Sequence, residues 1–127
     1  MQLSPYVRVD DTPFSASEED IVARRGEPTR RGRNFVQLSE LDYGDVVFRF
    51  QASGRLEEIT RRAPVLIIDG EVVLFPSLAE FVRGRDAEAF ERAGFVVSPA
   101  FGLAFDPQCP TWVTALARHC IDTWRAI

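Results

Sequence analysis

The segment Ala63–Phe75, which reads APVLIIDGEVVLF, constrains the fold more than any other stretch of the chain. Two apolar runs flank Asp69 and Gly70, and Asp-Gly is the preferred pair for a two-residue hairpin turn with positive φ at both positions. In that register one face carries Leu66, Ile68, Val73 and Phe75, and the other carries Val65, Ile67, Val72 and Leu74. A hairpin that is apolar on both faces is typical of the middle of a sheet, so we expect the rest of the chain to cover both faces.

The size and charge of the chain indicate one domain and a basic partner. A chain of 127 residues with 46% hydrophobic and 27% charged residues can bury a single core, so we expect one domain over residues 1–127. The net charge of −4 argues against a general nucleic-acid binder and favours a basic partner. The basic cluster within Arg24–Arg33 is either a phosphate-binding patch or a solvated loop beside a helix end. We favour the solvated loop because the whole chain is acidic.

The pattern of the first residues and the length of the apolar runs bear on the expected location of the protein. The first residues show no basic segment followed by an apolar run, and no apolar run approaches the roughly 20 residues that span a bilayer. We therefore expect a cytoplasmic protein without membrane contact. Cys109 is predicted to precede a helix that contains Cys120, which separates the two thiols by on the order of 15 Å. Two free thiols fit a reducing compartment.

The first half of the chain predicts a helix followed by successive antiparallel strands. A short strand is expected at Tyr6–Val9, and a short helix begins after a capping box at Ser17 or at Ser15. Phe35–Phe50 is predicted to be mostly strand, with Leu56–Arg62 as the return strand that leads into the hairpin. The connections are too short for a parallel crossover, so these strands predict an antiparallel meander.

The second half of the chain predicts two further helices. One begins at Ser77, is interrupted by Gly84 and continues through Gly94. Phe95–Phe105 is predicted to form a strand, a bend and a second short strand. The last helix is expected over Thr111–Arg125, where apolar residues recur at spacings of three and four. The predicted fold class is therefore α+β, with an antiparallel meander sheet of about five strands packed by about three helices.

The sequence contains no recognisable catalytic or cofactor-binding motif. A zinc site needs about four ligands at paired spacings, whereas this chain has one His and two distant Cys, so we predict no metal and no cofactor. A nucleophile elbow, a phosphate loop and a dinucleotide fingerprint are all missing from the sequence. His119 is interpreted as a partly buried helix residue, with a general base as the less favoured alternative. We therefore expect a protein that is not an enzyme and has no catalytic residues.

Four carboxylates of the meander are the predicted partner-binding residues: Asp42, Asp45, Glu57 and Glu58. Asp42 and Asp45 flank Tyr43-Gly44 and would cluster if Gly44 formed a bulge or tight turn. Glu57 and Glu58 are adjacent on a strand, so their side chains are expected to point to opposite faces. The alternative is that all four belong to a solvated rim without a function of its own.

Three segments carry a resemblance to a known class of proteins: LDYGDVVFRF at 41–50, LEEIT at 56–60 and AFGLAFDPQCPTWVTALARHCIDTWR at 100–125. In the order of their elements, residues 17–127 resemble small bacterial immunity proteins encoded beside polymorphic or contact-dependent toxins. The resemblance implies a cytoplasmic, non-catalytic inhibitor that binds one cognate toxin, and it carries over no catalytic residue. The alternative is a small-molecule-binding or enzymatic α+β domain whose pocket lies between sheet and helices. The sequence leaves the oligomeric state open.

Overall fold

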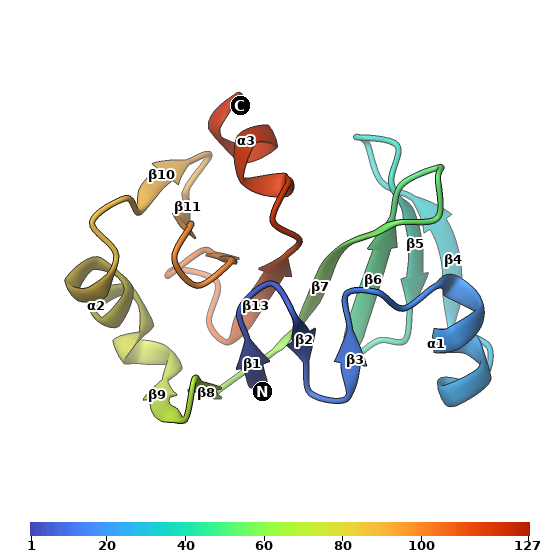
Figure 1. The fold of residues 1–127 in the computed structure, drawn as a ribbon, viewed down its shortest axis with the longest axis horizontal. Helices are drawn as coiled ribbons and strands as arrows, with labels where there is room; N and C mark the ends of the chain where they lie inside the picture. Colours follow the sequence, from blue (N-terminus) through green and yellow to red (C-terminus); the bar gives the residue numbers. More distant parts are fainter.

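The computed structural model describes residues 1–127 as an α+β fold of two sheets and three helices (Figure 1). The five-stranded sheet has the order β3-β2-β1-β8-β9. Its strands are β1 (Gln2–Ser4), β2 (Arg8–Val9), β3 (Thr12–Pro13), β8 (Val65–Ile68) and β9 (Glu71–Leu74). The helices are α1 (Glu18–Arg25), α2 (Phe75–Arg85) and α3 (Cys120–Arg125). None of the three helices has the length and apolar character needed to cross a membrane.

The eight-stranded sheet has the order β10-β11-β12-β13-β7-β6-β5-β4, and all its pairings are antiparallel. Its first four strands in the chain are β4 (Arg30–Arg33), β5 (Ser39–Asp42), β6 (Val46–Phe50) and β7 (Leu56–Arg62). The other four are β10 (Phe90–Arg92), β11 (Phe95–Ser98), β12 (Leu103–Phe105) and β13 (Trp112–Leu116). The α+β class is confirmed, and the predicted antiparallel meander is matched in part: β4 to β7 form one, but it belongs to an eight-stranded sheet and a second sheet of five strands is present. The predicted strand at 35–50 is divided among a loop, β5 and β6.

The β8–β9 hairpin has the predicted turn and register. Asp69 and Gly70 have φ of 49° and 85°, and Leu66 pairs with Val73. Its position in the fold differs from the prediction, because β8 pairs in parallel with β1 and not with β7. The hairpin therefore lies in the five-stranded sheet, and β13 occupies the place beside β7.

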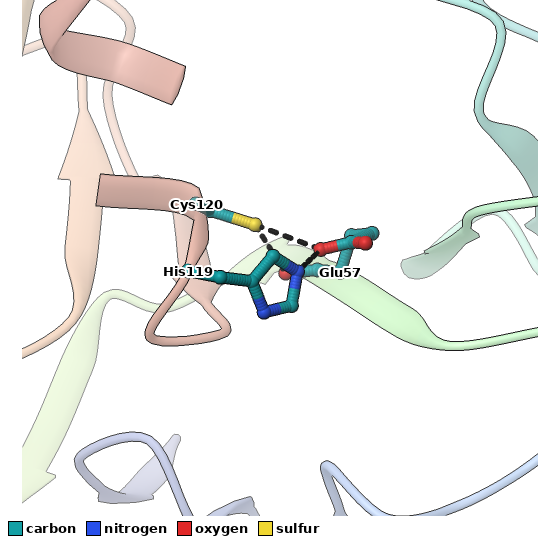
Figure 2. A group of neighbouring side chains, drawn as sticks. All are labelled: Glu57, His119 and Cys120. Atoms are coloured by element: carbon teal, nitrogen blue, oxygen red, sulfur yellow. Dashed lines mark hydrogen bonds and ion pairs between the residues drawn. The ribbon is translucent and has the colours of Figure 1, made fainter. Parts of the chain in front are cut away.

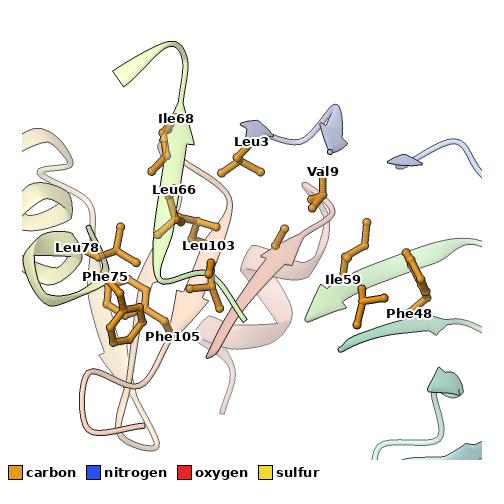
Figure 3. Packing of buried hydrophobic residues seen from close by; sticks show 14 of the residues in the cluster. Leu3, Val9, Phe48, Ile59, Leu66, Ile68, Phe75, Leu78, Leu103 and Phe105 are labelled. Atoms are coloured by element: carbon orange, nitrogen blue, oxygen red, sulfur yellow. The ribbon is translucent and has the colours of Figure 1, made fainter. Parts of the chain in front are cut away.

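Only one face of the hairpin is covered by the chain. Leu66 and Ile68 are 0% and 1% exposed and belong to a core shared with Leu3, Phe48 and Ile59, which come from both sheets (Figure 3). On the opposite face the side chains remain in solvent: Val65 is 41% exposed, Val72 68% and Leu74 54%. The prediction that both faces are covered is therefore wrong, because the core layer between the two sheets reaches only one of them.

Helix α1 begins and ends as its residues predict, whereas α2 begins at Phe75, before the predicted Ser77 and without a side-chain cap, and ends earlier than predicted. Ser17 and Asp20 form the capping box of α1, with Ser17 Oγ accepting the Asp20 N–H at 3.1 Å, so Ser17 and not Ser15 is the cap. Helix α2 runs through Gly84 and stops at Asp86. The predicted helical continuation to residue 94 is wrong: Ala93 and Gly94 have φ of 52° and 84° and form a hairpin turn between β10 and β11.

The predicted helix over 111–125 is a strand followed by a short helix. Within β13, Val113 and Ala115 are buried while Trp112 and Thr114 are half-buried, which is the alternation of a strand. Trp, Val and Thr favour strands, and β7 offers a long partner with Thr60 opposite Thr114. Helix α3 begins only at Cys120, and Cys109 lies on an exposed loop before β13.

Candidate functional site

Asp42 and Asp45 lie at the turn between β5 and β6 but have different surroundings. Asp42 accepts the Gly44 N–H at 2.8 Å and pairs with Arg30 at 3.0 Å, and these two interactions hold the pKa of its carboxyl below the usual value. Asp45 is exposed and lines a small hollow of about 90 Å³ together with Arg61. The two carboxylates therefore do not form one joint binding site, and the charge of Asp42 is already balanced by Arg30.

Glu58 belongs to a polar network that crosses four strands of the eight-stranded sheet. Arg49 donates to Glu40 at 2.6 Å, to Glu58 at 3.4 Å and to Thr60 at 2.7 Å. Thr60 in turn shares a hydrogen bond of 2.8 Å with Thr114 on β13. Burial raises the pKa of the Glu58 carboxyl above its usual value, although Arg49 acts in the opposite direction.

Glu57 is the extra residue of a β-bulge in β7. Arg49 lies opposite Glu58, but the next residue of β6, Phe50, lies opposite Leu56, so Glu57 has no partner in the register. The Glu57 side chain is turned into the protein and is 2% exposed. The prediction that Glu57 is an exposed partner-binding carboxylate is therefore wrong. Asp42, Asp45 and Glu58 remain as predicted partner-binding residues.

The buried carboxylate of Glu57 meets two side chains from the start of α3, and we call Glu57, His119 and Cys120 the Glu57 cluster (Figure 2). Cys120 Sγ donates a hydrogen bond to Glu57 Oε2 at 3.0 Å, and His119 Nε2 contacts the same oxygen. The other oxygen, Oε1, accepts from Arg55 Nε at 3.3 Å. The Ala117 N–H donates to the Glu57 carbonyl at 2.9 Å, which ties this end of β7 to the segment before α3.

The Glu57 cluster is not arranged as a cysteine–histidine nucleophile. Burial, and then the adjacent Glu57 carboxylate, raise the pKa of the Cys120 thiol well above its ordinary value. The thiol hydrogen bonds to a carboxylate oxygen and not to the imidazole, so the pair lacks the direct thiol–imidazole contact of a cysteine–histidine nucleophile. The three side chains are ligand types that Zn²⁺ uses, and their ligand atoms lie within 4.8 Å of one another.

Sequence reasoning found Glu57 only as a carboxylate and did not connect it with His119 or Cys120. The contact between Glu57 and His119 joins positions 62 residues apart. It depends on the pairing of β13 with β7, which the predicted helix over 111–125 excluded. The one sequence feature that could have pointed to the cluster is the adjacent pair His119 and Cys120, since both residue types bind metals.

Two further surfaces stand out by their exposed apolar side chains. One is the outer face of the β8–β9 hairpin, formed by Val65, Val72 and Leu74. The other is the tip of the β4–β5 hairpin, where Phe35 is 95% and Val36 57% exposed. Exposed apolar groups that gather on one face are typical of protein-binding surfaces.

The larger hollow of the molecule, about 440 Å³, lies against α1 and β3. Most of the residues around it are of polar or charged type, with Asp11, Asp20 and Arg24 among them, although much of the wall is formed by their apolar atoms. Arg24 and Asp11 pair with each other across 3.2 Å. Small-molecule sites are lined mainly by hydrophobic and aromatic side chains, so the residue types around this hollow differ from those of a ligand pocket.

Comparison of the chain with protein-family models, with curated proteins and with solved structures finds no match.

Proposed function

We propose that this chain is a protein-binding module, and more specifically an immunity-type inhibitor that neutralises one cognate toxin. The observation that carries the proposal is the uncovered face of the β8–β9 hairpin. Its residues Val65, Val72 and Leu74 are 41%, 68% and 54% exposed. Two of the three are β-branched, which suits a side chain that packs against another sheet or an extended segment. A partner that covers this face buries the apolar surface that the chain itself leaves in solvent.

The backbone of β9 adds a second binding element to this face. Strand β9 is the outer strand of the five-stranded sheet, so one of its edges has no neighbouring strand within the chain. An open edge beside apolar side chains accepts an extended segment of a partner as an additional strand. Glu71 at the start of β9 is held by Arg85 of α2 through hydrogen bonds of 2.9 and 2.8 Å, which fixes the strand against the helix.

The acidic balance of the chain supports the choice of a toxin as partner. Toxins that act on nucleic acid present basic active sites, and an inhibitor with a net charge of −4 is attracted to such a surface. The alternative function, a small-molecule-binding or enzymatic domain, has the hollow beside α1 as its only candidate among the two cavities described above. Arg24 and Asp11 beside that hollow already pair with each other, whereas the apolar face of the hairpin has no partner within the chain, which favours protein binding.

The proposal is tested with the double variant Val72→Arg/Leu74→Arg and the toxin domain encoded by the adjacent gene. We expect surface plasmon resonance to show binding of the wild-type chain and at least a roughly tenfold weaker affinity for the double variant. Phe35→Ser is the matched control, because it removes an exposed apolar side chain at the other end of the molecule. Inhibition of the toxin should likewise be retained by the wild-type chain and by Phe35→Ser and be weakened in the double variant.

Three results would overturn the proposal. The first is unchanged affinity of the double variant, and the second is the absence of any binding between the wild-type chain and the toxin domain. The third is a wild-type chain that sediments as a dimer and becomes monomeric in the double variant, since the hairpin face would then bind a second copy of the chain.

A further inference from the structure

We propose that Glu57, His119 and Cys120 form a binding site for one divalent transition-metal ion of the Zn²⁺ and Co²⁺ class. This inference is independent of the proposed protein binding. The three side chains supply an oxygen, a nitrogen and a sulfur ligand, which is the donor set that zinc accepts in proteins. The ligand atoms already lie within 4.8 Å of one another, from two segments far apart in the sequence.

The spacing of the ligand atoms fits a four-coordinate ion. Zinc bonds of roughly 2.0–2.3 Å in a tetrahedron separate neighbouring ligand atoms by about 3.5 Å. Cys120 Sγ and Glu57 Oε2 are 3.0 Å apart. Small side-chain rotations that move these two atoms apart by a fraction of an ångström would bring them to coordinating positions. His119 is the residue directly before α3 and its side chain is 35% exposed, so its ring has room to adjust.

The carboxylate of Glu57 is oriented for a single metal bond. Arg55 donates to Oε1, whereas Oε2 faces both His119 and Cys120. Hydrogen bonds from a neighbouring residue to the second oxygen of a ligating carboxylate are a regular feature of metal sites, because they fix the ligand in place. The β-bulge contributes to this arrangement, since it turns the Glu57 side chain out of the normal strand alternation.

The charges of the cluster also suit a divalent cation. The Glu57 carboxylate, 2% exposed, has one compensating charge beside it, because the half-exposed Arg55 guanidinium lies 3.3 Å from Oε1 on the side away from the other two ligands. With a divalent ion bound, the Glu57 carboxylate and a Cys120 thiolate together carry two negative charges, and the neutral imidazole adds none. The ion therefore leaves the buried ligands with no net charge.

Binding follows a balanced exchange of protons for the ion. Three coordinate bonds form, to Glu57 Oε2, His119 Nε2 and Cys120 Sγ. The S–H bond of Cys120 breaks and its proton leaves to solvent, as does any proton on Nε2, so no oxidation or reduction takes place. Three protein ligands leave the fourth tetrahedral position for a water molecule.

The experiment is a titration of the full chain with Co²⁺, followed by absorption spectroscopy, and with Zn²⁺, followed by calorimetry. We expect one ion per chain and a thiolate-to-cobalt charge-transfer band in the near ultraviolet. Cys120→Ser should abolish the band, and Cys109→Ser is the matched control that should retain it, since Cys109 is the other, exposed thiol. His119→Ala should weaken Zn²⁺ binding by more than the roughly 10–100-fold that loss of an outer-shell partner costs.

Several outcomes would overturn the site. Absence of the band in the wild-type chain means that the cluster is a purely structural hydrogen-bonded group. Loss of the band in Cys109→Ser together with its retention in Cys120→Ser means that the exposed thiol binds the ion. Where circular dichroism shows that Cys120→Ser does not fold, His119→Ala decides, and unchanged Zn²⁺ affinity in that variant rejects the proposal.

Discussion

Glu58 is a charged residue whose surroundings have a direct consequence for stability. Burial raises the pKa of its carboxyl above the ordinary 4.5. Arg49 lowers this pKa, but by less than burial raises it. A carboxyl with a raised pKa in the folded state binds its proton more tightly there than in the unfolded chain. Its stabilising contribution is therefore complete below the unfolded pKa and is lost as the pH rises through the folded pKa.

The variant Glu58→Gln tests this pH dependence. We expect the free energy of unfolding of the wild type, relative to that of Glu58→Gln, to fall between about pH 4 and about pH 7, because only the wild type must ionise a buried carboxyl. Urea denaturation at both pH values measures the difference. Glu80→Gln is the control for removing one exposed carboxylate. A difference that grows with pH would show that the ion pair with Arg49 outweighs burial.

The β8–β9 hairpin is the element that connects sequence, core and proposed interface. Its inner face is part of the core between the two sheets, and its outer face is in solvent. We therefore expect Leu66→Ala to lower the free energy of unfolding by about 2–5 kcal/mol, the usual range for truncation of a buried leucine. Val72→Ala, 68% exposed on the outer face, should cost less than about 1 kcal/mol.

Chemical denaturation of both variants measures these costs. Coverage of both faces, as the sequence predicts, would make Ile67→Ala as costly as Leu66→Ala. Ile67 is only half-buried on the outer face, so we expect Ile67→Ala to be less costly. Equal losses for Leu66→Ala and Val72→Ala would contradict the one-sided burial of the hairpin.

Elements with a local signal could be predicted from the sequence, and elements that depend on distant pairing could not. The Asp69-Gly70 turn and the Ser17 capping box are specified by a few adjacent residues, and both are confirmed. Buried residues of the last segment, such as Val113 and Leu116, fit a helical spacing as well as a strand followed by a turn. Residues 112–116 form a strand because they pair with β7, and no pattern among neighbouring residues reveals that pairing. The Glu57 cluster was missed for the same reason.

At the scale of the whole molecule, the net charge of −4 governs how a basic partner approaches. Reversing Asp42 and Asp45 to Arg should slow association with the toxin more than it speeds dissociation. The defect should shrink with added salt, because exposed charges are screened within about 8 Å at physiological ionic strength. Surface plasmon resonance at two salt concentrations measures both rates.

Two points refine the electrostatic experiment. Asp42 already pairs with Arg30, so Asp45→Arg alone is the cleaner variant, and Glu57 is left out because it is buried. Association rates that do not change in either variant at low salt would mean that the acidic charge does not steer the encounter.

The position of β13 also sets the order in which the chain is able to fold. Strands β4 to β7 and strands β10 to β12 are two sets of consecutive hairpins, each formed from contacts close in sequence. β13 is the last strand in the chain but lies inside the sheet, where it joins the two sets, and Thr114 meets Thr60 across 54 residues. Closing such a long loop costs chain entropy before the new contacts form, and proteins rich in distant contacts fold slowly. We therefore expect the two halves of the sheet to form early and independently, and the pairing of β13 with β7 to come late and to limit the folding rate.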